Sequence, residues 1–263
     1  MGEQNMLRIE QVDIKGHNAA WAILSIDRQK QRNALNTELL GQIADALDDF
    51  AQSSTVRAVL ICGEGEHFAA GADIHEIKDK GREEGYLDPR KAHWKRIRNC
   101  PLPLVAAVDG FCLGGGFELA LMCDLIVAGT TAKFGLPEPN LGLIPGAGGI
   151  ERLTNMVGRA RAGRIVLGGE IVDAITANDW GIISYMAEDG ALPFAAKLTE
   201  RLALRAPLAM RAAKKAIVAS AETPLKHVMG ETRGDFENLL GTADKAEGVT
   251  AFLDKRKPTF EGK

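Results

Sequence analysis

The feature that most constrains the fold is a recurring unit: an apolar run, a turn of small residues and then a helical pattern. Residues 57–62 (RAVLIC) precede the turn GEGEHFAAGA and a helical segment that starts near Asp73. Residues 104–108 (LVAAV) precede DGFCLGGG and a helical segment that starts near Phe117. A third run, 125–127, leads into the turn-rich PEPNLGLIPGAGG. Strands that alternate with helices predict an α/β fold.

Further elements flank these units. Residues 19–26 (AAWAILSI) are typical of a strand, and residues 37–50 repeat apolar side chains at helical spacing, with Asn36 or Thr37 as the N-cap. After about Ala191 the strand signals stop and only helical segments follow. These segments are 194–204, 208–221, 225–240 and 243–253. The chain therefore divides into an α/β core, 1–190, and a C-terminal helical region, 191–263, which is either a lid or an oligomerisation module.

Composition excludes several classes of function. The 263 residues carry a formal charge of −3, so no overall basic field attracts nucleic acid or an anionic membrane. The four cysteines form no CxxC pair, which argues against zinc and favours small buried thiols in a reducing compartment. The polar N-terminus has no signal-peptide pattern, and no apolar run reaches the roughly 18 residues of a membrane span. We expect a cytoplasmic protein.

The first candidate site is LGGGFELAL at 113–121. Three glycines before a helix expose free N–H groups at the positive end of the helix dipole, which suits an anion or a developing oxyanion. Alternatively, the glycines only permit close packing and Glu118 only complements the dipole. The segment lacks GxGxxG and GK[ST], so nucleotide binding is a weak reading.

Two more candidates flank it in the sequence. In HFAAGADIHEI, 67–77, the backbone N–H of Ala70 lies in a turn of small residues, although Asp73 and Glu76 also have the spacing of a helix capping box. In LPEPNLG, 136–142, Glu138 lies between two prolines that stiffen the loop, although it could be an ordinary exposed glutamate. Together, two N–H donors and two carboxylates suit proton transfer beside a polarised carbonyl.

These residues resemble the crotonase (enoyl-CoA hydratase/isomerase) family. The resemblance runs over nearly the whole chain, from NALN at 33–36 through AAGADI at 69–74 and the block 110–149 to FLDKRK at 252–257. It implies a core of repeated ββα units, a C-terminal helical region that forms trimers or hexamers, and a role in fatty acid metabolism. It also implies an acyl-CoA substrate, with coenzyme A present only as part of that substrate and no metal or other cofactor.

Carried over residue by residue, the resemblance implies that the N–H groups of Ala70 and Gly115 form an oxyanion hole for the thioester oxygen. Glu118 would activate the water that attacks C3, and Glu138 would protonate C2. The substrate would lie against Gly115 and the segment Ala70, Gly71, Ala72, Asp73. The activity implied is hydration of a trans-2-enoyl-CoA to a 3-hydroxyacyl-CoA.

Two alternatives stay open. The nearest is a Δ3,Δ2-enoyl-CoA isomerase, or another acyl-CoA dehydratase, on the same scaffold. A more remote one is a non-catalytic RNA-binding relative, against which the two glutamates and the acidic charge argue. The basic run RKAHWKRIR at 90–98 is interpreted as a solvated helix face, with contact to the phosphates of coenzyme A or to RNA as the alternatives.

Overall fold

The computed structural model describes residues 6–263 and is built around a six-stranded sheet. Its strand order is β1-β2-β3-β4-β6-β9. The antiparallel hairpin of β1 and β2 forms one edge, and all other neighbours are parallel. The strands are β1 (Leu7–Asp13), β2 (Ala20–Ile26), β3 (Val56–Gly63), β4 (Leu104–Val108), β6 (Leu125–Gly129) and β9 (Tyr185–Ala187). The α/β architecture expected from the sequence is confirmed.

A small second sheet carries the loops that follow the parallel strands. It consists of β5 (Phe111–Leu113), β7 (Lys133–Gly135) and β8 (Val172–Asp173). Two parallel strands of the large sheet, β4 and β6, continue into a strand of the small sheet and then into a helix. The clearest repeats are β4–β5–α5 (Gly115–Met122) and β6–β7 followed by the 3-10 helix η2 (Glu138–Leu141) and α6 (Gly149–Val166). These are the expected ββα units.

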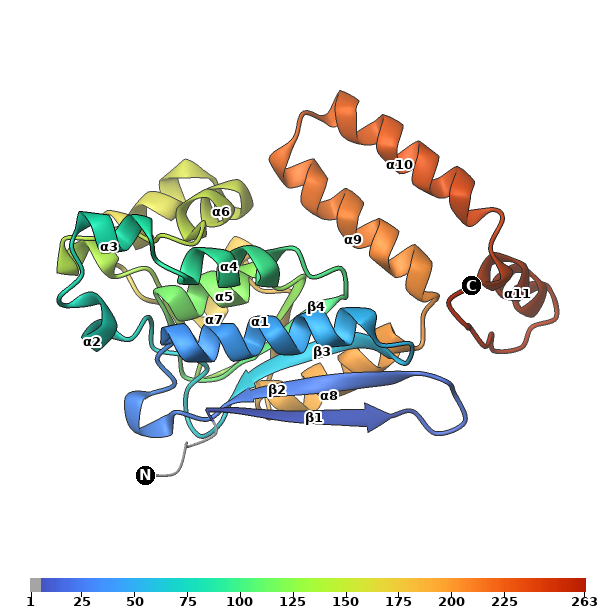
Figure 1. Cartoon of the computed structure of the whole chain (residues 1–263), viewed down its shortest axis with the longest axis horizontal. Helices are drawn as coiled ribbons and strands as arrows, with labels where there is room; N and C mark the ends of the chain where they lie inside the picture. The colour runs from blue at the N-terminus through green and yellow to red at the C-terminus, as the bar shows by residue number, and fades with distance from the viewer. Residues whose placement is uncertain (1–5) are drawn as a thin grey trace.

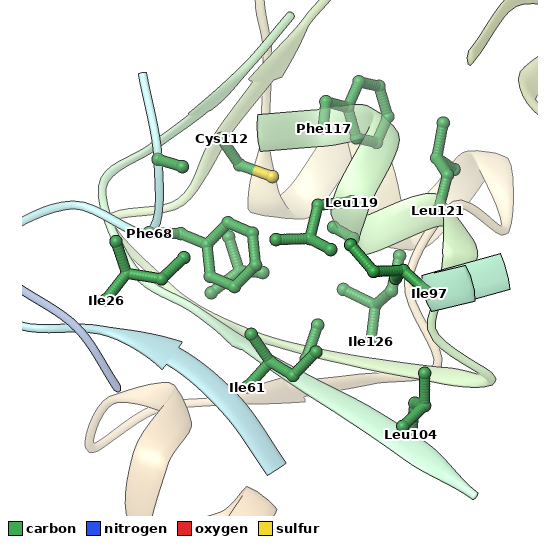
Figure 2. Packing of buried hydrophobic residues seen from close by; sticks show 14 of the residues in the cluster. Ile26, Ile61, Phe68, Ile97, Leu104, Cys112, Phe117, Leu119, Leu121 and Ile126 are labelled. Atoms are coloured by element: carbon green, nitrogen blue, oxygen red, sulfur yellow. The ribbon is translucent and has the colours of Figure 1, made fainter. Parts of the chain in front are cut away.

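The core lies between the large sheet and the helices above it. Side chains from both layers meet there, among them Ile61 and Leu104 of the sheet, Phe117 and Leu119 of α5, and Phe68 (Figure 2). The helix α1 (Thr37–Gln52) lies across this layer, and the Asn36 side chain caps it by accepting from the N–H of Leu39. The other helices that precede α8 are η1 (Gln29–Gln31), α2 (Ile74–Ile77), α3 (Arg82–Tyr86), α4 (Arg90–Arg98) and α7 (Ala174–Trp180).

The capping box expected at the start of α2 does not form. Asp73 does cap the helix, accepting from the N–H of His75 at 3.1 Å. Glu76 instead accepts from the backbone N–H and the hydroxyl of Thr37, at 2.8 and 2.7 Å. That expectation was wrong because Glu76 finds donors at the start of α1, a partner distant in sequence. Glu76 thereby ties this short helix to the core.

The basic run at 90–98 forms α4, and two of its three arginines, Arg90 and Arg96, pair with carboxylates of this chain. Arg96 contacts Asp45 and Asp48 of α1 at 2.6 and 2.7 Å. Arg90 hydrogen-bonds Asp88 just before the helix. Pairing within the chain accounts for these two charges.

The C-terminal helices fall into two groups (Figure 1). The helix α8 (Ala191–Ala203) lies under the large sheet, where Leu198 packs in a cluster with Leu60 and Val105. The helices α9 (Pro207–Glu222), α10 (Leu225–Leu239) and α11 (Ala243–Leu253) extend away from the core. Within residues 6–263, no helix combines the length and apolar character needed to cross a membrane.

Candidate active site

The N-terminus of α5 supplies the first backbone donor. Gly114 precedes the helix with φ of +50°, a backbone region that favours glycine, and its own N–H donates to Gly135 at 2.9 Å. Gly115 is the first residue of the helix, where an N–H has no intrahelical partner. Among residues 6–263 this N–H has no acceptor. It is therefore available to a ligand.

The loop after β3 supplies the second donor, and it is not the expected one. The N–H of Ala70 already donates to the carbonyl oxygen of Arg32 at 3.0 Å. Leu35 pairs with Ala72 as in a parallel sheet: its N–H donates to Gly71 at 2.8 Å, and its carbonyl accepts from Asp73 at 2.9 Å. In such a pairing the N–H of Ala72 points away from Leu35.

Ala72 thus replaces Ala70 as the free donor of this segment. Its N–H has no acceptor within the described part of the chain. A Cβ placed on Gly115 would lie 3.5 Å from the amide nitrogen of Ala72, so the two free donors are neighbours. This corrects the expectation for Ala70, whose N–H instead holds the loop in place.

Asp73 also supports the loop. One carboxylate oxygen forms an ion pair with Arg28 at 2.8 Å, and the other accepts from His75. Burial alone would raise the pKa of Asp73, but the hydrogen bonds from Arg28 and His75 hold it below its ordinary value. Both oxygens of Asp73 have partners on this chain, so Asp73 shapes this side of the site.

Glu118 lies on α5, one turn after Gly115, and is 4% exposed. Its Oε1 accepts from the N–H groups of Ala147 and Gly149 at 2.6 and 2.9 Å. Burial raises the pKa of Glu118, and the hydrogen bonds from this turn, together with the charge of Arg152, oppose the increase. The site therefore holds a buried carboxylate whose ionised form is stabilised by two N–H donors.

Glu138 begins η2 and approaches α5 from the other side. Its Oε2 is buried and has no hydrogen-bond partner among residues 6–263, whereas a Cβ on Gly114 would lie 3.0 Å from its Oε1. Burial raises the pKa of Glu138 to about 7, and the charge of Glu118 adds to the increase. At neutral pH this carboxyl group can exist in either protonation state.

The four groups converge on the first turn of α5. Ala72 lies beside Gly115, Glu138 lies beside Gly114, and Glu118 is on the same helix. Two N–H donors can stabilise negative charge on a carbonyl oxygen, while two carboxyl groups in different environments can take up and give up a proton. In the described part of the chain, no group of three or more His, Cys, Asp and Glu side chains is placed to hold a metal ion.

Sequence reasoning did not identify the turn that holds Glu118. The glycines in PGAGG indicated a turn, but they gave no sign that Ala147 and Gly149 donate to a side chain about 30 residues earlier. A Cβ on Gly149 would lie 2.9 Å from Cγ of Glu118, so glycine leaves the space that the glutamate occupies. The glycine-rich composition of this turn was the available signal.

Comparison with known proteins gives one consistent result. The family model described as enoyl-CoA hydratase/isomerase matches residues 16–263. The chain is 41% identical to a 2,3-dehydroadipyl-CoA hydratase of Escherichia coli over 92% of this chain and 95% of the relative. It is 40% identical to a probable enoyl-CoA hydratase of Rhizobium meliloti over 91% and 93% of the two chains. A crystal structure of enoyl-CoA hydratase from Bacillus anthracis is similar with a TM-score of 0.90 and 30% identity, covering 98% of this chain and 100% of that one.

Proposed function

Because the chain belongs to the enoyl-CoA hydratase/isomerase family and has the crotonase fold, we propose that it adds water across the C2=C3 bond of a trans-2-enoyl-CoA. The product is a 3-hydroxyacyl-CoA. The observation that carries this proposal is the placement of two glutamates, Glu118 and Glu138, around a helix start that offers free N–H groups.

The thioester oxygen binds between the N–H groups of Ala72 and Gly115 in this proposal. Conjugation makes C3 electrophilic, and negative charge moves onto the thioester oxygen as water adds. Hydrogen bonds to that oxygen strengthen as the charge develops. Each such donor typically contributes about 3–4 kcal/mol to transition-state stabilisation, so these two backbone groups supply a large part of the catalysis.

Proton transfer is divided between the two glutamates. Glu118, ionised and held at Oε1 by the 147–149 turn, accepts a proton from the attacking water through its other oxygen. Glu138, with its pKa raised to about 7, carries the proton that C2 receives. Oxygen and one hydrogen of the water go to C3, and C2 receives one proton from Glu138. The proton taken up by Glu118 passes back to Glu138 before the next turnover, so the enzyme is restored and no redox change takes place. No metal or cofactor beyond the coenzyme A of the substrate is required.

Only the similarity to known relatives restricts the range of candidate acyl groups in the substrate. A relative that is 41% identical is named for 2,3-dehydroadipyl-CoA, an enoyl thioester with a free carboxylate at the far end of its acyl chain. Others are named simply as enoyl-CoA hydratases. We therefore include both a dicarboxylic enoyl-CoA and simple enoyl-CoAs among the candidate substrates. The proposed metabolic role is the breakdown of fatty or dicarboxylic acyl chains.

We further propose assembly through α9–α11 into a trimer or a multiple of three, in the cytoplasm. On their own chain these helices bury only Lys214, Val228, Asp244 and Ala251. Large apolar side chains such as Phe252 remain exposed. The cysteines are free thiols, three of them buried, which suits a reducing compartment.

The test is turnover of a panel of crotonyl-CoA, a longer enoyl-CoA, 2,3-dehydroadipyl-CoA and a trans-3-enoyl-CoA. Hydration removes the absorbance of the conjugated enoyl thioester, whereas isomerisation of the trans-3-enoyl-CoA creates it. We expect rapid hydration of at least one conjugated substrate and much slower isomerisation. Fast isomerisation without hydration of any conjugated substrate would replace the proposal with an isomerase.

A further inference from the structure

Arg152, near the start of α6, is a half-buried cation that pairs with no carboxylate of residues 6–263. Its Nη1 donates to the carbonyl oxygens of Ala147 and Gly148 at 2.9 and 3.2 Å. These are its only side-chain hydrogen bonds, and it forms no ion pair within residues 6–263. Partial burial of a charge without an ion pair costs free energy. The side-chain hydrogen bonds of Arg152 within residues 6–263 all go to one turn.

That turn is the one that holds Glu118. The Gly148–Gly149 peptide group has its carbonyl oxygen against Arg152 and its N–H against Oε1 of Glu118. One peptide therefore links the guanidinium group to the carboxylate. Withdrawal of electron density at the carbonyl oxygen strengthens the donor at the other end of the same peptide.

The turn needs an external restraint. Gly148 has φ of +93°, and glycines in such turns have more accessible backbone conformations than other residues. A Cβ on Gly148 would collide with Nη1 of Arg152, so the arginine packs directly on the backbone. The backbone N–H of Arg152 also donates to the Gly148 carbonyl, at 3.2 Å. The same residue therefore contacts that carbonyl twice.

We propose that Arg152 is a positioning residue for the hydration reaction: it clamps the 147–149 turn so that two N–H groups converge on Glu118. This inference rests on the proposed function. The charge of Arg152 also opposes the burial-driven increase in the pKa of Glu118. The other charged groups acting on the two residues are Glu138 in η2, Arg98 in α4, Glu151 in α6 and Glu222 at the end of α9.

The experiment compares Arg152→Met with Arg152→Lys and with the matched control Arg159→Met, an exposed arginine later on the same helix. We expect Arg152→Met to lower kcat by about 10- to 100-fold with little change in KM, because Glu118 is displaced. The acid limb of its kcat–pH profile should move to higher pH, because the pKa of Glu118 rises. Arg152→Lys keeps the charge and should restore the position of the limb with only part of kcat. Arg159→Met should match the wild type.

A second readout is independent of turnover. The protonation of Glu118 can be followed by infrared titration of its carboxyl band, assigned by subtraction of the Glu118→Gln spectrum. A midpoint raised in Arg152→Met and restored in Arg152→Lys supports the inference even if no enoyl-CoA is hydrated, which would refute only the proposed function. If Arg152→Met does not fold, the Arg152→Lys protein provides the test. A reduced kcat with an unchanged midpoint of the Glu118 titration then supports the inference. Unchanged kcat in both variants, or a loss of kcat in Arg152→Met without movement of limb or midpoint, would overturn it.

Discussion

At the scale of single residues, Glu118 and Glu138 differ in what surrounds their oxygen atoms. Oε1 of Glu118 accepts from two backbone N–H groups, which stabilises the ionised carboxylate. Oε2 of Glu138 is buried without a hydrogen-bond partner in the described residues, 6–263, and the pKa of Glu138 is raised to about 7. The same side chain is therefore suited to accept a proton at one position and to donate one at the other.

The first prediction concerns these two carboxyl groups. Glu118→Gln and Glu138→Gln should each lower kcat by about 10²- to 10⁴-fold, because an amide cannot exchange the proton that the reaction moves. Glu66→Gln is the control, since Glu66 is exposed in the segment that leads into the active-site loop. Steady-state kinetics on the best enoyl-CoA of the panel measures all three. Wild-type kcat in either active-site variant would remove that glutamate from the mechanism.

The second prediction concerns the effect of the raised pKa of Glu138 on the free energy of unfolding. Its pKa is about 7 in the folded protein against an ordinary value of 4.5. The folded state therefore loses stability as pH rises from about 4.5 to about 7, because ionisation becomes unfavourable only when the chain is folded. Glu138→Gln lacks this penalty and should be more stable than the wild type above neutral pH.

Urea unfolding at about pH 8.5 should show that difference as about 1–2 kcal/mol, after allowance for the partial exposure of the group. At about pH 4.5 the difference should shrink, because Glu138 is then largely protonated in the folded protein. Equal stabilities of the two proteins at both pH values would contradict a raised pKa for Glu138.

The choice between Ala70 and Ala72 shows what a single residue's sequence context can and cannot reveal. AAGADI indicated a backbone N–H left open by small side chains and assigned it to Ala70, whereas the N–H without an acceptor in residues 6–263 is that of Ala72. Which N–H is free depends on Arg32 and Leu35, whose backbones pair with this segment from more than 30 residues away. The residues of the turn itself do not indicate that pairing.

Among the secondary-structure elements, α6 begins with a glycine that leaves space for the side chain of Glu118. Gly149 faces Glu118 closely, whereas a Cβ on Gly163, later in the same helix, would meet nothing within 4 Å. Gly149→Ala should therefore displace Glu118 and lower kcat by about 10- to 100-fold. Gly163→Ala should leave kcat unchanged and stabilise the helix by about 0.5–1 kcal/mol.

Paired kinetic and unfolding measurements on the two alanine variants test this prediction. A loss of stability with normal kcat in Gly149→Ala would mean that the space beside Glu118 matters only for packing.

Elements were predictable where their signal is local. The helix α1 has a full apolar face and a good N-cap, and the strands β3 and β4 are continuous apolar runs, so all three were located from sequence. The strands β5 and β7 have only three residues each. They form because β4 and β6, the strands that precede them, bring these residues next to each other in a second sheet. Such elements depend on tertiary pairing and leave almost no periodic pattern.

At the scale of the whole molecule, the three helices α9–α11 lie apart from the core (Figure 1). Lys214 anchors α9, donating to the Leu102 carbonyl at 2.7 Å and pairing with Asp124 at 2.8 Å. Most of the large apolar side chains of these three helices are exposed, including Ile217 at 68% and Phe252 at 82%. An exposed apolar surface of this extent is typical of a protein interface.

We therefore expect light scattering to give a mass of three, or a multiple of three, times the subunit mass of 28.2 kDa. Phe252→Glu should shift the protein toward smaller species, because a charge would be buried in the interface. A monomer at all protein concentrations would contradict this assembly and would leave α9–α11 as a lid.

If this protein adds water to C3 of an enoyl-CoA, the oxygen atom of that water must appear in the product. The wild-type protein is incubated with its best conjugated enoyl-CoA in water enriched in oxygen-18, and the product is analysed by mass spectrometry. We expect a 3-hydroxyacyl-CoA with the heavy oxygen at C3, formed at the rate at which the enoyl absorbance is lost. Recovery of unlabelled enoyl-CoA, or of a positional isomer without heavy oxygen, would contradict the proposed hydration.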